Sequence, residues 1–139
     1  MTKLIYADLT YKIRGSIFNV YNTLGFGHKE QVYQKALAEE LKGKKINYER
    51  EKRLAVRYKG KTVGSYQPDF IIENKIILEI KAVKFMPKIF ETQVLNYLKG
   101  IGYKLGLLIN FGGQRLIIKR LVWTNPRKSV ANQRKSLKK

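Results

Sequence analysis

Hydrophobic residues recur at intervals of three and four in three segments, which is the spacing that places them along one side of an α-helix. In the first segment this spacing runs through Ile13, Ile17 and Val20, and one or more glycines follow each segment. Glycine after an apolar stripe is typical of a helix end. The pattern therefore predicts three helices, over residues 8–24, 28–42 and 87–99.

Short apolar runs with the length of β-strands occupy much of the remaining chain up to residue 123. The central pair, Phe70–Ile72 and Ile76–Leu78, flanks a polar break at Glu73–Lys75, which predicts a hairpin. Both runs are continuous rather than alternating, so we expect both faces of these strands to be buried. The first strand of the hairpin is expected to start at Thr62, and the other predicted strands lie at 54–56, 105–111 and 116–123.

The predicted elements follow one another in the order α-α-β-β-β-α-β-β. Helices mixed with strands in this way indicate an α/β fold, in which helices cover both faces of a sheet. We expect a central mixed β-sheet of four to five strands. The chain has 139 residues and is 44% hydrophobic, which suits one domain with a single core. We place that domain at residues 1–123 and a basic, flexible tail at 124–139.

The predicted hairpin carries three charged residues, Asp69, Glu79 and Lys81, in an apolar setting where isolated charges are costly. A turn of three residues would place Asp69 directly opposite Glu79, with Cβ atoms ~5 Å apart and Lys81 on the same face. Two carboxylates this close repel unless a cation lies between them, and Mg²⁺ prefers such oxygen ligands. Lys81 could then hold an attacking water or a phosphate oxygen. A two-residue turn would instead put Asp69 on the other face and exclude this site. The alternative to a metal site is an ordinary hairpin in which Glu79 and Lys81 form an ion pair.

Composition narrows the classes of function. The chain has no cysteine and a single histidine, His28, which excludes thiol catalysis, cysteine-held metals and sites built from several histidines. No apolar run is long enough for a transmembrane helix, and residues 1–11 lack the apolar core of a signal peptide. We therefore expect a cytoplasmic protein without membrane association.

A formal net charge of +19 indicates a polyanionic partner, most often nucleic acid. Basic residues gather in the segment 42–61 and in the tail. Tyr48, Tyr58 and Tyr66, in and shortly after that segment, could stack on bases. The alternatives are a generally basic protein, an edge strand protected by lysines, and a tail that only aids solubility. The expected nucleic-acid-binding residues are Arg53, Arg57, Lys59, Lys61, Arg127, Lys128, Arg134 and Lys135.

Two further pairs of residues share a helix face because they are three or four positions apart. The second predicted helix carries Glu30 and Tyr33 after Gly27, in the pattern G-x-x-E-x-x-Y. The third carries Gln93 and Tyr97, in the pattern Q-x-x-x-Y. A glutamate in a first helical turn is favourable there in any protein. For Tyr33, the alternative role of an ordinary core aromatic is favoured.

These motifs appear in one order along the chain: G-x-x-E-x-x-Y, then Pro68-Asp69, then Glu79-Ile80-Lys81, then Q-x-x-x-Y. The ordered set resembles the GxxExxY family, a member of the RecB-like branch of the PD-(D/E)xK nuclease superfamily. The resemblance covers residues 3–123, and the segment Gly106–Gly112 is similar to the closing strand of that family. The tail lies outside the resemblance.

The resemblance implies a restriction-endonuclease-like core and a nuclease that depends on Mg²⁺ or Mn²⁺. It implies that Asp69, Glu79 and the carbonyl of Ile80 bind the metal, with Glu30 binding it directly or through water. Lys81 would orient the attacking water and stabilise charge on the phosphate. Gln93, Tyr97 and Tyr33 would position the substrate, with DNA expected rather than RNA, and a homodimer is compatible with the family.

Two alternatives share this scaffold. One is a Holliday-junction resolvase, which a dimer and cleavage of four-way junctions would favour. The other is a catalytically silent nucleic-acid-binding protein, which binding without cleavage under any metal would favour. The complete set of two acids and a lysine favours an enzyme, since a pure binder has no need of carboxylates where phosphate must come.

Overall fold

The computed structural model describes residues 5–124. Almost all of the tail predicted over 124–139 therefore lies outside the described residues, including Arg127, Lys128, Arg134 and Lys135. Within the described part, no helix is both long and apolar enough to cross a membrane.

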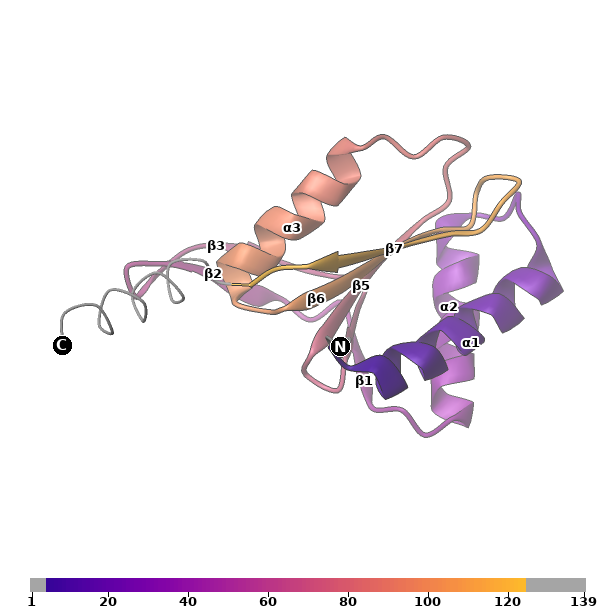
Figure 1. Ribbon diagram of the computed structural model, residues 1–139, viewed down its shortest axis with the longest axis horizontal. Helices are drawn as coiled ribbons and strands as arrows, with labels where there is room; N and C mark the ends of the chain where they lie inside the picture. Colours follow the sequence, from indigo (N-terminus) through magenta and orange to yellow (C-terminus); the bar gives the residue numbers. More distant parts are fainter. Residues whose placement is uncertain (1–4, 125–139) are drawn as a thin grey trace, which may run out of the picture.

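Three helices and seven strands make up the described chain (Figure 1). The helices begin and end close to the positions that the hydrophobic spacing predicts, with differences of one or two residues. The elements are α1 (Ala7–Leu24), α2 (Glu30–Gly43), β1 (Tyr48–Arg50), β2 (Leu54–Tyr58), β3 (Lys61–Tyr66), β4 (Phe70–Ile72), β5 (Ile76–Lys81), α3 (Ile89–Ile101), β6 (Leu105–Asn110) and β7 (Ile117–Val122).

The central sheet has five strands in the order β1-β4-β5-β6-β7. Strands β5 and β6 are parallel and are joined by α3, whereas every other neighbouring pair in this sheet is antiparallel. The sheet is therefore mixed, as expected, and the α/β architecture is confirmed.

Helices cover both faces of the sheet, with α1 and α2 on one side and α3 on the other (Figure 1). On the α1–α2 side, Ile17 and Leu37 pack with Leu78 of β5. On the α3 side, Leu98 packs with Ile77. Alternate residues of β5 thus face opposite layers, and both layers are apolar because the strand is buried on both faces.

The β4–β5 turn contains three residues, as the hairpin prediction requires. Ile72 pairs with Ile76, and the Lys75 amide donates a hydrogen bond of 2.9 Å to the Ile72 carbonyl. Glu73 and Asn74 both adopt positive φ, which the short side chain of asparagine tolerates better than most. This turn decides which charged side chains share a face.

The prediction of one continuous strand from Thr62 to Ile72 is wrong. This segment forms two strands in different sheets, because the chain breaks at Gln67–Asp69, where Pro68 has no amide to donate to a ladder. Strand β3 pairs instead with β2 in a separate two-stranded sheet that packs against α3. The vacated edge of the central sheet is filled by β1, a strand that the apolar pattern missed.

The chain after β5 passes very close to the chain after β6. The side chain of Asn110 is buried and bonds both the amide of Val83 (3.0 Å) and its carbonyl (2.9 Å). A Cβ on Gly112 would lie 2.3 Å from the Val83 nitrogen, so this position has no room for a side chain. The contact fixes the path of the chain immediately beyond Lys81.

We expect Gly112→Ala to destabilise the protein by about 1–3 kcal/mol, because backbone atoms have to move to admit the methyl group. Chemical denaturation of the wild type and the variant measures the difference. Gly43→Ala is the matched control, since a Cβ there meets nothing within 4 Å. Equal unfolding midpoints for Gly112→Ala and the wild type would contradict the crowding described above.

Candidate active site

Asp69, the residue immediately before β4, lies opposite Glu79 of β5. The register pairs Phe70 with Leu78, and one further step places Asp69 across from Glu79. Asp69 Oδ2 accepts a hydrogen bond of 2.7 Å from the amide of Ile80, which ties the acid to the edge of β5. By the alternation of β5, Glu79 and Lys81 are on the α3 side of the sheet, the same side as Ile77.

Burial raises the pKa of both carboxyl groups. For Asp69, the hydrogen bond from Ile80 and the charge of Lys81 partly oppose this rise. For Glu79, burial is again the largest cause, the negative charge of Asp69 adds to it, and the pKa reaches about 7. A hydrogen bond from Tyr66 and the charge of Lys81 act in the opposite direction. The two acids are therefore close enough to resist ionising together.

Glu30 lies in the other layer, close enough for the charge of Asp69 to act on it. It is the first residue of α2, and the pKa of its carboxyl group is raised by burial and by the charge of Asp69, whereas Lys81 lowers it. Gln34 donates to Glu30 Oε1 at 3.4 Å, and Arg50 donates to Gln34 at 3.3 Å, which holds the glutamate in place.

The three acids do not form a compact triad. Within residues 5–124, no group of three acidic or histidine side chains is gathered closely enough to hold a metal ion. Mg²⁺ is commonly held by one or two carboxylates together with water and substrate phosphates. Asp69 and Glu79 supply such a pair of hard oxygen donors, and their raised pKa values indicate that a cation between them would be favourable. The donor set therefore fits a divalent metal.

Lys81 lies between the acids and the start of α3. Its Nζ is 4.6 Å from the centre of the Phe90 ring, a cation–π contact, and the side chain is half-buried. Its charge acts on Asp69, Glu79 and Glu30 alike. Position 81 thus places one cation close enough to lower the pKa of all three carboxyl groups.

Tyr66 is a site residue that the sequence reasoning misplaced among base-stacking aromatics. Its ring is buried, and its hydroxyl donates a hydrogen bond of 2.5 Å to Glu79 Oε1. The ring of Tyr97 stacks on it with centroids 3.7 Å apart and an angle of 6° between the planes. Tyr97 therefore adjoins the acid pair through Tyr66, and Gln93 is exposed one turn earlier on α3.

Tyr33 lies in the core between α2 and the sheet. The side chain has no exposed surface and stacks on Phe111 with centroids 4.5 Å apart. Its hydroxyl donates to the Gly25 carbonyl at 2.6 Å and accepts from the His28 amide at 3.2 Å. The structure thus gives Tyr33 no contact with a substrate, and its effect on the site is through the loop that precedes Glu30.

The basic residues of the β2–β3 sheet are exposed on the α3 side of the molecule. Arg53 donates to the hydroxyl of Ser65 at 2.9 Å, which fixes its guanidinium group on the hairpin. The other three, Arg57, Lys59 and Lys61, surround the turn that joins the two strands.

Comparison with known proteins supports the fold. No curated protein matches the chain. The solved structure of SSO0001 is similar, with a TM-score of 0.54 and 23% identity. The match covers 74% of this chain and 55% of that chain, so this protein spans about half the length of SSO0001. An alkaline exonuclease (LHK-Exo) from Laribacter hongkongensis is similar with a TM-score of 0.51 and 12% identity, over 96% of this chain and 77% of that one. At these identities the similarity concerns the fold alone.

The sequence itself matches a family model. The model of the PD-(D/E)XK nuclease superfamily matches residues 7–121, which include both acids of the hairpin, Lys81, Glu30 and the whole of α3. The acids and the lysine that this superfamily is named for are the residues that the β4–β5 turn brings to one face. The chain belongs to the PD-(D/E)XK nuclease superfamily.

Proposed function

We propose that this protein is a metal-dependent nuclease that hydrolyses phosphodiester bonds of DNA. The observation that most strongly supports this proposal is the placement of Asp69 opposite Glu79, with Lys81 on the same face, in a chain of a nuclease superfamily. The order of its motifs further supports a place in the GxxExxY family of the RecB-like branch.

In this proposal Asp69 and Glu79 hold Mg²⁺ or Mn²⁺, with an oxygen from the Ile80 carbonyl and with Glu30 acting directly or through water. The bound metal would neutralise charge that develops on the scissile phosphate. Lys81 orients the attacking water and adds positive charge at the same place. Gln93 and Tyr97, exposed on α3, position the nucleic acid strand. Its phosphates are bound by Arg53, Arg57, Lys59 and Lys61.

We further propose that Tyr66 is a positioning residue for Glu79. Its hydroxyl occupies one carboxylate oxygen, which fixes the direction of the other. Stacking on Tyr97 keeps the phenol in place, so α3 and β3 together orient an acid of β5. Partners of this kind around metal ligands typically change metal affinity ~10–100-fold when removed.

Loss of Glu79 or Lys81 tests the proposal directly. We expect Glu79→Gln and Lys81→Ala each to lower cleavage at least ~10²-fold, as removal of a charge-stabilising group does. Cleavage of single-stranded, duplex, circular and four-way-junction DNA, and of RNA, with Mn²⁺ or Mg²⁺ measures this. Glu39→Ala, an exposed change on α2, is the control. Wild-type rates in both variants would refute the site.

Without a bound metal, the buried carboxyl group of Glu79 should make the stability of the folded protein depend on pH. The pKa of Glu79 is raised from 4.5 to about 7, so the folded state binds this proton more tightly than the unfolded state. Stability without metal therefore falls as the pH rises between these values. We expect Glu79→Gln to be more stable than the wild type at pH 8 in chelator, by ~1–3 kcal/mol, and to lose that advantage at pH 4. Thermal unfolding at both values checks this, and an equal difference at both contradicts it.

The role of Tyr66 is tested by Tyr66→Phe, which keeps the ring and its stacking but removes the hydroxyl. We expect Mn²⁺ affinity, measured by calorimetry without substrate, to fall by at least ~10-fold. Tyr58→Phe, in the same two-stranded sheet and exposed, is the matched control. Unchanged Mn²⁺ affinity in Tyr66→Phe would show that Glu79 is oriented without it.

A further inference from the structure

Helix α1 carries two large aromatic side chains on the surface, away from the sheet. Its apolar residues Ile13, Ile17 and Val20 face the core and are buried. By contrast, Tyr11 is 80% exposed and Phe18 is 48% exposed. They are seven residues apart, so they lie on one side of the helix about 10 Å apart along its axis. Exposed aromatic groups on one helix side are typical of a binding surface.

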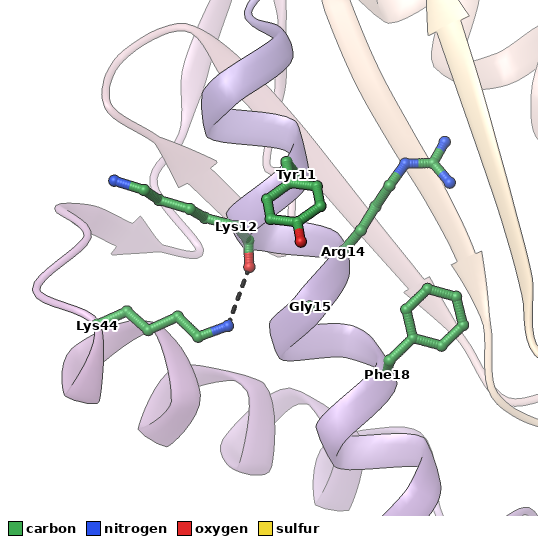
Figure 2. Close-up of a pocket in the computed structure, with 6 residues that line it drawn as sticks. All are labelled: Tyr11, Lys12, Arg14, Gly15, Phe18 and Lys44. Atoms are coloured by element: carbon green, nitrogen blue, oxygen red, sulfur yellow. Dashed lines mark hydrogen bonds between the residues drawn. The ribbon is translucent and has the colours of Figure 1, made fainter.

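A hollow of about 640 Å³ lies between these rings and the end of α2 (Figure 2). Such a volume is within the ~300–1,000 Å³ of small-ligand pockets, which is enough for a nucleotide. Of the described residues that line it, three are cations and none is acidic. The lining residues are Tyr11, Lys12, Arg14, Gly15, Phe18 and Lys44.

One of the cations is held in position. Lys44 follows α2, and its Nζ donates a hydrogen bond of 3.2 Å to the carbonyl of Lys12 (Figure 2). A Cβ on Gly15 would lie 3.2 Å from this Nζ, so the glycine leaves the space that the ammonium group uses. The ammonium group therefore lies on the surface of α1, at the base of the pocket.

The positive charge continues beyond the pocket. Burial and the charge of Arg14 both lower the pKa of Arg120 on β7, whose guanidinium group donates to the Ile5 carbonyl at 2.7 Å. Arg14 thus lines the pocket and also lies close enough to Arg120 for their charges to interact. Cations beside exposed aromatic rings are the combination that binds single-stranded nucleic acid, through phosphate contacts and base stacking.

We propose that this pocket binds an unpaired segment of a nucleic acid strand. Lys12, Arg14 and Lys44 would contact phosphates, while Tyr11 and Phe18 would stack on bases. A paired duplex does not offer its bases for stacking, so the geometry favours a single strand. A second copy of this chain fits poorly, because three cations of each copy would meet in a protein of net charge +19.

The pocket is separate from the proposed catalytic group. Helix α1 packs on the face of the sheet that carries Leu78 and Ile80, whereas Glu79 and Lys81 are on the α3 face. Glu30 is in the same layer as α1, but it begins α2, at the opposite end of that helix from Lys44. A strand held on α1 would therefore raise affinity without touching the acids. This inference rests on the proposed function only in taking nucleic acid as the substrate.

Binding of a fluorescein-labelled oligo(dT) 20-mer to the full chain in chelator tests the pocket. We expect the triple change Tyr11→Ala, Arg14→Gln, Phe18→Ala to weaken binding at least ~5-fold, since one base–aromatic stack alone is worth that much. Lys35→Gln, an exposed lysine of α2, removes the same charge and should bind as the wild type does. A blunt duplex of the same length should show a smaller loss.

Gly15→Glu is the second variant, because it keeps both rings and places a carboxylate beside Lys44; we expect it to weaken oligo(dT) binding as well. Circular dichroism verifies the fold of each variant. Oligo(dT) affinity equal to wild type in every folded variant overturns the inference. So does a wild type that dimerises in solution while the triple variant is monomeric.

Cleavage by the wild type with Mn²⁺ separates the two proposals. If it cleaves DNA while every pocket variant binds oligo(dT) normally, the pocket fails and the nuclease proposal stands. If it binds oligo(dT) through the pocket without cleaving any substrate, the pocket stands and the nuclease proposal fails. A wild type that neither binds nor cleaves overturns both.

Discussion

The placement of two carboxylates opposite each other, one immediately before β4 and one on β5, is the constraint on which the rest of this structure depends. Asp69 and Glu79 stand in an apolar sheet where burial alone raises both pKa values, and their mutual repulsion adds to the rise for Glu79. An arrangement that disfavours ionisation persists only where surrounding groups compensate for it. The compensation comes from the Ile80 amide, the Tyr66 hydroxyl and the Lys81 charge.

Residues that support the site come from both layers of the molecule. From the α3 side, Tyr97 stacks on Tyr66, and Phe90 lies under the ammonium group of Lys81. From the α1–α2 side, Tyr33 orders the loop that brings Glu30 to the sheet. A residue far from the acids can therefore affect them by moving an element, which is how the helices of this fold contribute to the site.

The sequence alone was sufficient for the parts that depend on local rules. The helices follow from apolar spacing, and the shared face of Asp69, Glu79 and Lys81 follows from strand alternation and a three-residue turn. The position of Glu30 near them was available only through the order of motifs, since α2 and β5 are far apart in the chain. A buried asparagine in an apolar run, Asn110, was a signal that went unused.

What only the tertiary structure decided is which distant residues surround the acids. Tyr66 looked like its exposed neighbours along a basic strand, yet the break at Pro68 turns its strand under α3 and its hydroxyl onto Glu79. Tyr33 is a residue of α2 whose position in its helix does not show what its ring contacts. The tertiary structure places that ring against Phe111 of the sheet layer. Spacing along a chain determines the direction of each side chain within its element, whereas the packing of elements determines what that side chain meets.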